Sequence, residues 1–202
     1  MTNWANPTPA GLVGLAVACF CFFAMLNKDL TGVTVPDILP LLGCILLGGF
    51  VIQLIVALLD LKAGAIPGGN TFLFFSAYFM LASGLEMFVK YFALTGQWQG
   101  AVDGKIDGWL WLCLGIAIIL WTPAFFKSPA ILFGIVLLLD VAVPLVALND
   151  LGIAKEICGP LAGWFLLATG VFGLYLSAAL LVNGTYGKTV FPNPGPLYKE
   201  KK

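Results

Sequence analysis

The stretch NPTPAGLVGLAVACFCFFAML, residues 6–26, begins with a polar, proline-rich turn and continues as an apolar run. The run from Ala10 to Leu26 carries no charged residue and approaches the length of about 20 residues that a helix needs to cross a bilayer. Proline in the first turn of a helix costs no hydrogen bond, so the prolines indicate a helix start. A cleaved signal peptide has a lysine or arginine before its apolar run, and none precedes this one. We therefore expect the run to remain in the protein as a membrane span.

The composition extends this interpretation to the whole chain. Of its 202 residues, 60% are hydrophobic and 10% are charged, whereas a soluble domain has about 25% charged residues. The apolar runs lack the period-two alternation of a membrane β-barrel, so helices are favoured. We therefore predict an all-α integral membrane protein with six transmembrane helices packed as one bundle, in a single domain of residues 1–202. The expected spans are about 10–26, 38–61, 72–94, 109–126, 130–148 and 161–182.

An even number of spans places both termini on one side of the membrane. The lysines on that side are Lys62, Lys127, Lys188, Lys199, Lys201 and Lys202, and those on the other are Lys28, Lys90, Lys105 and Lys155. The excess favours cytoplasmic termini in the cell membrane, since cytoplasmic loops carry more basic residues.

Several classes of function are not expected. The chain has no arginine, no histidine and a net charge of zero. We therefore expect no nucleic-acid partner, no haem and no typical zinc site. We expect no cofactor and no metal, and we interpret the five cysteines as small hydrophobic side chains. No serine or cysteine has a histidine with which to form a nucleophile pair, so we expect no enzyme.

Ionisable and amide side chains inside spans are costly and are therefore functional candidates. Asp140 lies in the middle of the fifth span, four residues before Pro144, which lacks the N–H that would bond the carbonyl of residue 140. Asp140 is either a path-facing group that binds solute or carries a proton, or a carboxyl that bonds a neighbouring helix. Gln53, in the second span, is either a group that bonds the solute or an amide that bonds another helix. Glu86 and Lys90 have the spacing of a helical ion pair near one interface.

The turn at Asn6 and Pro7 has a possible role of its own. A helix start presents unpaired N–H groups and the positive end of the helix dipole. In a chain without arginine, this helix start is a candidate for attracting anions, and the alternative is an ordinary helix cap.

Three stretches resemble a known family. NPTPAGL resembles the NPAPLGL signature of the acetate uptake transporters, the succinate–acetate permeases. GNTF at 69–72 and the YGKTV.P pattern at 186–192 agree with that family in order and position. The resemblance implies a six-helix protomer with a substrate path through its centre and assembly as a homohexamer. It places Asn6 and Pro7 at the cytoplasmic end of the path, and Asn70 is a further candidate for the path.

The resemblance also implies an apolar constriction made by Phe, Tyr and Leu on the first, third and fifth spans. The Phe position falls on Leu15 and the Leu position on Leu138. The Tyr position falls on Tyr78 by local match, or on Met80 by an ungapped count from GNTF.

We therefore expect a transporter or channel for acetate and related small monocarboxylates, with succinate as a further candidate substrate and with proton linkage. Its partners would be the carboxylate solute and the lipid bilayer. An ionised Asp140 beside the path would repel a carboxylate, which leaves a second hypothesis, a channel for a small neutral or cationic solute such as urea or ammonium. The third hypothesis is an intramembrane enzyme or a sensor that transports nothing.

Overall fold

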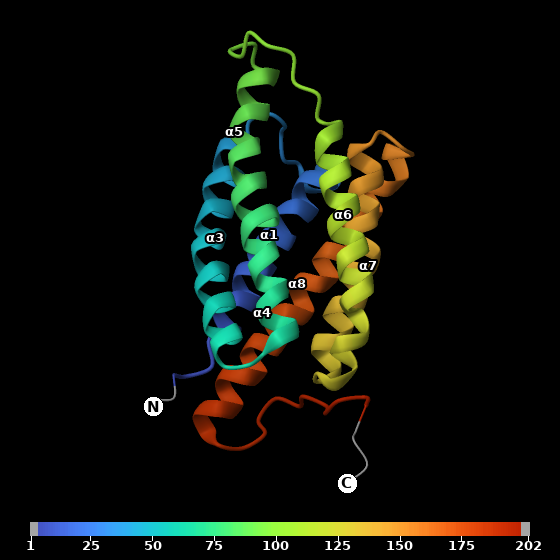
Figure 1. Cartoon of the computed structure of the whole chain (residues 1–202). Coiled ribbons are helices and arrows are strands. Elements are labelled where there is room, and N and C mark those ends of the chain that lie inside the picture. The colour runs from blue at the N-terminus through green and yellow to red at the C-terminus, as the bar shows by residue number, and fades with distance from the viewer. Residues whose placement is uncertain (1–3, 199–202) are drawn as a thin grey trace.

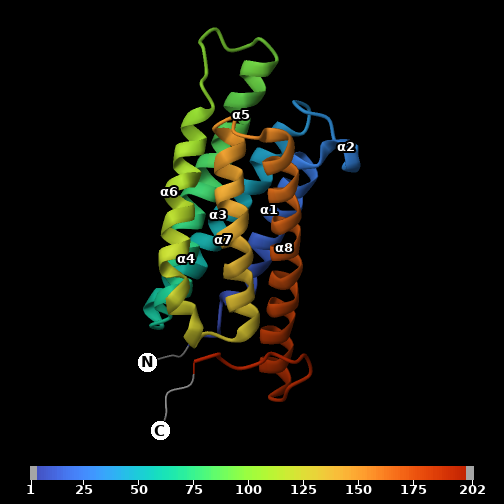
Figure 2. The same cartoon turned by 90° about the vertical axis from the view of Figure 1, so that its right-hand side faces the viewer.

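The computed structural model describes residues 4–198 and confirms the predicted all-α membrane fold (Figures 1 and 2). Within these residues, six helical segments are long and apolar enough to cross a membrane. They are α1 (Thr8–Leu26), α3 (Leu39–Lys62), the continuous run α4–η1–α5 (Ile66–Leu94), α6 with η2 (Lys105–Lys127), α7 (Ala130–Asp150) and α8 (Lys155–Tyr186). A short helix, α2 (Lys28–Thr31), follows α1. The beginning of α1 and the end of α8 lie at the same end of the bundle (Figure 1).

Three spans begin four to six residues earlier than the sequence suggested, and α1 begins two residues earlier. The third begins at Ile66 because Pro67 fits the first turn of α4, and the chain reverses instead at Gly64, whose φ is +84°. The fourth begins at Lys105, whose backbone N–H donates to Asp103 Oδ1 at 3.0 Å. The sixth begins at Lys155 and accommodates Pro160 inside the helix.

Some predictions concern residues outside the described part. Lys199, Lys201 and Lys202, which support the predicted orientation, lie there. The assignment of residues 1–202 to one domain stays a prediction.

The third span contains an irregular segment. It is composed of α4 (Ile66–Phe74), the π-helical segment η1 (Phe75–Ala82) and α5 (Ser83–Leu94). A π-helix bonds i to i+5, so the side chains along η1 are rotated relative to an ideal α-helix, and such segments are frequent at functional sites.

The helices pack in a ring. The order of close neighbours is α6, α7, α8, α1, α3 and then the third span. One close crossing of the ring lies between α3 and α5, where a Cβ placed on Gly43 would stand 2.8 Å from the carbonyl oxygen of Gly84. The third and fourth spans approach each other less closely than the other neighbours do. Between these two spans the ring is completed by side-chain contacts.

Candidate functional site

A group of aromatic rings occupies the centre of the bundle. Phe79 of η1 is 4% exposed and contacts three rings. Ring centroids lie 5.2 Å away for Phe22 of α1, 5.5 Å for Phe75 of η1 and 5.6 Å for Trp111 of α6. The contact between Phe79 and Trp111 joins the third span to the fourth at mid-depth.

These rings nearly fill the interior. They border a cavity of about 10 Å³, room for at most one water molecule. Five of the six spans contribute to its lining, which consists of Phe22, Phe75, Phe79, Trp111, Leu139, Val143, Val146 and Leu166. The centre of the bundle is therefore apolar and closed in this conformation.

The predicted constriction residues do not line this cavity. Tyr78 is 45% exposed, whereas its neighbour Phe79 faces the centre. Met80 is fully buried and is placed against Gly49 of α3. Leu15 is buried in the core and Leu138 is half-buried, beside the cavity-lining Leu139. Neither the local match nor the ungapped count selects Phe79, the residue of η1 that lines the cavity beside Phe75.

The end of the bundle that holds the α1 start carries a second group of predicted residues. Asn6 Oδ1 accepts the backbone N–H of Thr8 at 3.0 Å, and Pro7 provides the N-cap of α1. The Thr8 hydroxyl lies 3.2 and 3.3 Å from the two carboxylate oxygens of Asp60, which is 4% exposed. The helix start is thus not a bare anion site, because the chain's own carboxylate stands beside it.

Asn70 lies at the same end, in an open pocket of about 380 Å³ between α4 and the end of α6. Its amide Nδ2 donates to the carbonyl of Ile66 at 2.9 Å. Trp121 lines this pocket. The ring centroid of Phe74 lies 5.3 Å from that of Trp121 and 4.6 Å from that of Phe75. An aromatic column therefore leads from this pocket to the central rings.

Gln53 is the most isolated polar group of the interior. Its side chain is 0% exposed, and within residues 4–198 neither its Nε2 nor its Oε1 has a hydrogen-bond partner. A buried amide without partners costs about 1–3 kcal/mol. Such a group is a natural candidate for binding a polar solute.

Asp140 bonds a neighbouring helix. Its carboxylate oxygens lie 2.7 and 3.0 Å from the hydroxyl of Thr122, at the junction of α6 and η2. This is the second of the two interpretations that the sequence left open. A role in carrying a proton stays a prediction.

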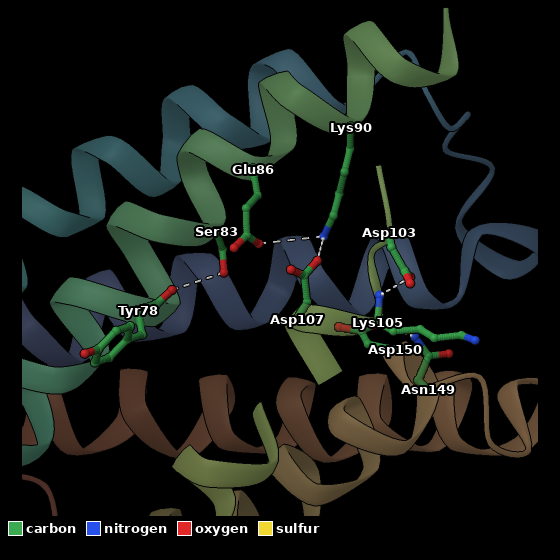
Figure 3. A network of polar contacts seen from close by, with 9 residues as sticks. All are labelled: Tyr78, Ser83, Glu86, Lys90, Asp103, Lys105, Asp107, Asn149 and Asp150. Atoms are coloured by element: carbon green, nitrogen blue, oxygen red, sulfur yellow. Dashed lines mark hydrogen bonds and ion pairs between the residues drawn. The ribbon is translucent and has the colours of Figure 1, made fainter. Parts of the chain in front are cut away.

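The opposite end of the bundle holds an ion cluster (Figure 3). Lys90 Nζ lies 3.7 Å from Glu86 Oε2, which is the predicted helical pair, and 2.6 Å from Asp107 Oδ2. Asp107 is 5% exposed and belongs to α6, so this ion pair is a second link between the third and fourth spans. Sequence reasoning missed Asp107, because nothing local indicates a partner 17 positions away. Asp107 precedes Trp111 by one helical turn, so the cluster borders the aromatic centre.

The chain is similar to one family of membrane transport proteins in sequence and in fold. The model of the GPR1/FUN34/yaaH family matches residues 1–195. The succinate-acetate/proton symporter SatP of Escherichia coli is 26% identical over 194 residues, 95% of this chain and 96% of the symporter. Ammonia transport outward protein 2 of Saccharomyces cerevisiae is 23% identical over 155 residues, 73% of this chain but about half (51%) of the yeast protein. The solved structure of the bacterial acetate channel SatP has the same fold, with a TM-score of 0.73, 20% sequence identity, and coverage of 95% of this chain and 99% of the channel.

Proposed function

This chain belongs to the GPR1/FUN34/yaaH family, and from that premise we propose that it moves acetate and related small monocarboxylates across a membrane, linked to protons. Succinate is a further candidate substrate. The observation that carries the proposal is similarity along nearly the full length of both this chain and a succinate-acetate/proton symporter. The resemblance noted at NPTPAGL, GNTF and YGKTV.P is confirmed by the family match.

The solute path follows the aromatic column. It runs from the pocket at Asn70, past the central rings, to the ion cluster at Lys90, and Asn6 and Pro7 stand at its first end. We assign the constriction to Phe22, Phe79 and Trp111, which close the centre, in place of Leu15, Tyr78 and Leu138. Apolar constrictions gate pores by excluding water, so a ring must move before a solute passes.

Two polar groups serve the solute inside the membrane. Gln53 Nε2 donates a hydrogen bond to the carboxylate and thereby gains the partner that it lacks. Asp140 exchanges the linked proton, and Thr122 holds the carboxyl in place. Because Gln53 binds the solute and Asp140 exchanges the proton, the solute carboxylate is not placed beside the carboxylate of Asp140.

The setting of the protein follows from the same premise. The six apolar helices make it a multi-pass membrane protein. We propose the cell membrane, cytoplasmic termini and a homohexamer, as the family resemblance implies. The relatives named above are transporters or channels, which supports a transport role and no enzymatic one.

Labelled acetate uptake into proteoliposomes, with and without an imposed pH gradient, tests the proposal. Accumulation that requires the gradient supports proton-linked movement, and uptake that ignores the gradient indicates an anion channel. Empty liposomes are the control. Absence of acetate uptake would refute the proposal.

Ammonium is the second candidate solute. The yeast relative is an ammonia transport outward protein, and Asp140 provides a carboxyl at mid-depth. Excess ammonium or urea that blocks labelled acetate uptake, while propionate does not, would favour this alternative.

A further inference from the structure

Lys90 borders two different cavities at the end of the bundle opposite the termini. One is polar, about 200 Å³, and is lined by Lys90, Gly104, Lys105, Asp107, Asp150 and Lys155. The other is apolar, about 280 Å³, and its lining includes Met25, Leu39, Met87 and Ala93 together with Lys90. Lys90 therefore lines both a polar cavity and an apolar cavity.

The polar cavity offers lysines to an anion, and as many carboxylates as lysines stand around it. Three lysines and two aspartates line it, and Glu86 approaches Lys90 from α5 without lining it. Within residues 4–198, neither Lys105 nor Lys155 has a carboxylate oxygen within 4.0 Å. Lys90 itself has three N–H donors, and among the carboxylates of the described residues Asp107 lies at 2.6 Å from its Nζ and Glu86 at 3.7 Å. A donor remains for a further carboxylate.

The apolar cavity suits a short hydrocarbon chain. Its volume lies just below the range of about 300–1,000 Å³ that holds drug-sized ligands, so it fits a smaller one. Met25, Leu39 and Met87 come from three different spans and surround it with apolar atoms. Burial of each CH₂ group is favourable, so a longer chain binds more tightly until the space is filled.

We infer that this vestibule binds monocarboxylates that carry an alkyl chain, with the carboxylate on Lys90 and the chain in the apolar cavity. The inference rests on the proposed function and deepens it by naming a substrate class, monocarboxylates longer than acetate, and the residue that selects it. Asp107 is a resident competitor, since its carboxylate occupies one donor of Lys90 and repels a second anion. Binding at Lys90 places the solute one helical turn from the Trp111 ring.

Equilibrium dialysis of labelled acetate and butyrate with the purified full-length protein tests this inference. We expect butyrate to bind more tightly than acetate. Asp107→Asn lowers both dissociation constants by about two- to fivefold, the size of one charge interaction made at the partly exposed Lys90. The double variant Lys90→Gln/Asp107→Asn raises both above the native values without leaving Asp107 buried and unpaired. Ala93→Leu fills the apolar cavity and removes only the advantage of butyrate.

Lys28→Gln is the matched control, because Lys28 is exposed at the same end of the bundle and lines neither cavity. It leaves both dissociation constants unchanged. Equal dissociation constants for the native protein, Asp107→Asn and the double variant would overturn the inference. Tight, Lys90-dependent binding without flux in proteoliposomes would refute the proposed transport and leave the binding site standing.

Discussion

Replacement of Phe79 by alanine should increase solute flux. Phe79 contacts the rings of Phe22, Phe75 and Trp111 with centroid distances of 5.2, 5.5 and 5.6 Å. Each such aromatic pair contributes about 0.5–1.5 kcal/mol beyond area burial, so the three together amount to about 1.5–4.5 kcal/mol. If passage requires this ring to leave its neighbours, the variant no longer breaks those contacts. Since about 1.4 kcal/mol corresponds to a tenfold change in rate, the lower limit predicts about tenfold faster flux.

The assay is the initial rate of labelled acetate uptake per reconstituted protein, measured for Phe79→Ala and the native chain. Thermal unfolding of the purified proteins is followed in parallel, because Phe→Ala in a packed interior costs about 3–5 kcal/mol in soluble proteins. Phe172→Ala is the control, since Phe172 of α8 is 45% exposed and undergoes the same chemical change away from the central rings. A folded Phe79→Ala protein with native flux, or an equal increase in Phe172→Ala, would refute the assignment of the constriction.

Three further predictions concern the polar groups and the helix packing. Gln53→Leu should leave the thermal stability equal or higher, since it removes an unpaired buried amide, yet raise the KM for acetate; an unchanged KM would exclude Gln53 from the path. Asp140→Asn retains the bond to Thr122 but cannot exchange a proton, so the increase of uptake with falling external pH should be lost; an identical pH profile would assign Asp140 to packing alone. Gly43→Ala places a methyl group 2.8 Å from a backbone oxygen and should lower the melting temperature, whereas Gly48→Ala, with no atom within 4 Å, should not; equal melting temperatures would contradict the tight crossing of α3 and α5.

The sequence was sufficient for the number and type of the spans, because a run of apolar residues has few alternatives to a membrane helix. It was less informative about where spans begin. The expected starts at 72 and 161 lie after Pro67 and Pro160, but Pro67 lies in a first turn, where proline costs nothing, and Pro160 lies within α8. The chain reverses before α4 at Gly64, whose positive φ leaves no hydropathy signal.

The site was predicted less completely than the fold. The polar groups inside the spans were identifiable one by one, because each is costly in lipid. Their partners were not, since Thr122 and Asp107 meet Asp140 and Lys90 only through packing between spans. Phe79 lines the central cavity and its neighbour Tyr78 does not, and no sequence pattern marks which residue of the π-helical segment η1 faces inward. The constriction at Tyr78 or Met80 stays a prediction.

The seam between the third and fourth spans is closed differently from the rest of the ring. Elsewhere in the ring, neighbouring helices approach closely along their backbones, and such contacts are difficult to separate. At this seam the closure depends on side chains, namely the Phe74–Trp121 and Phe79–Trp111 ring pairs and, at the end opposite the termini, the Lys90–Asp107 ion pair. Side chains can change rotamer without moving a helix, so a solute can pass here while the bundle stays intact. A carboxylate bound at Lys90 competes with Asp107 for the same ammonium group, and it would thereby loosen one of the side-chain links that hold the seam closed.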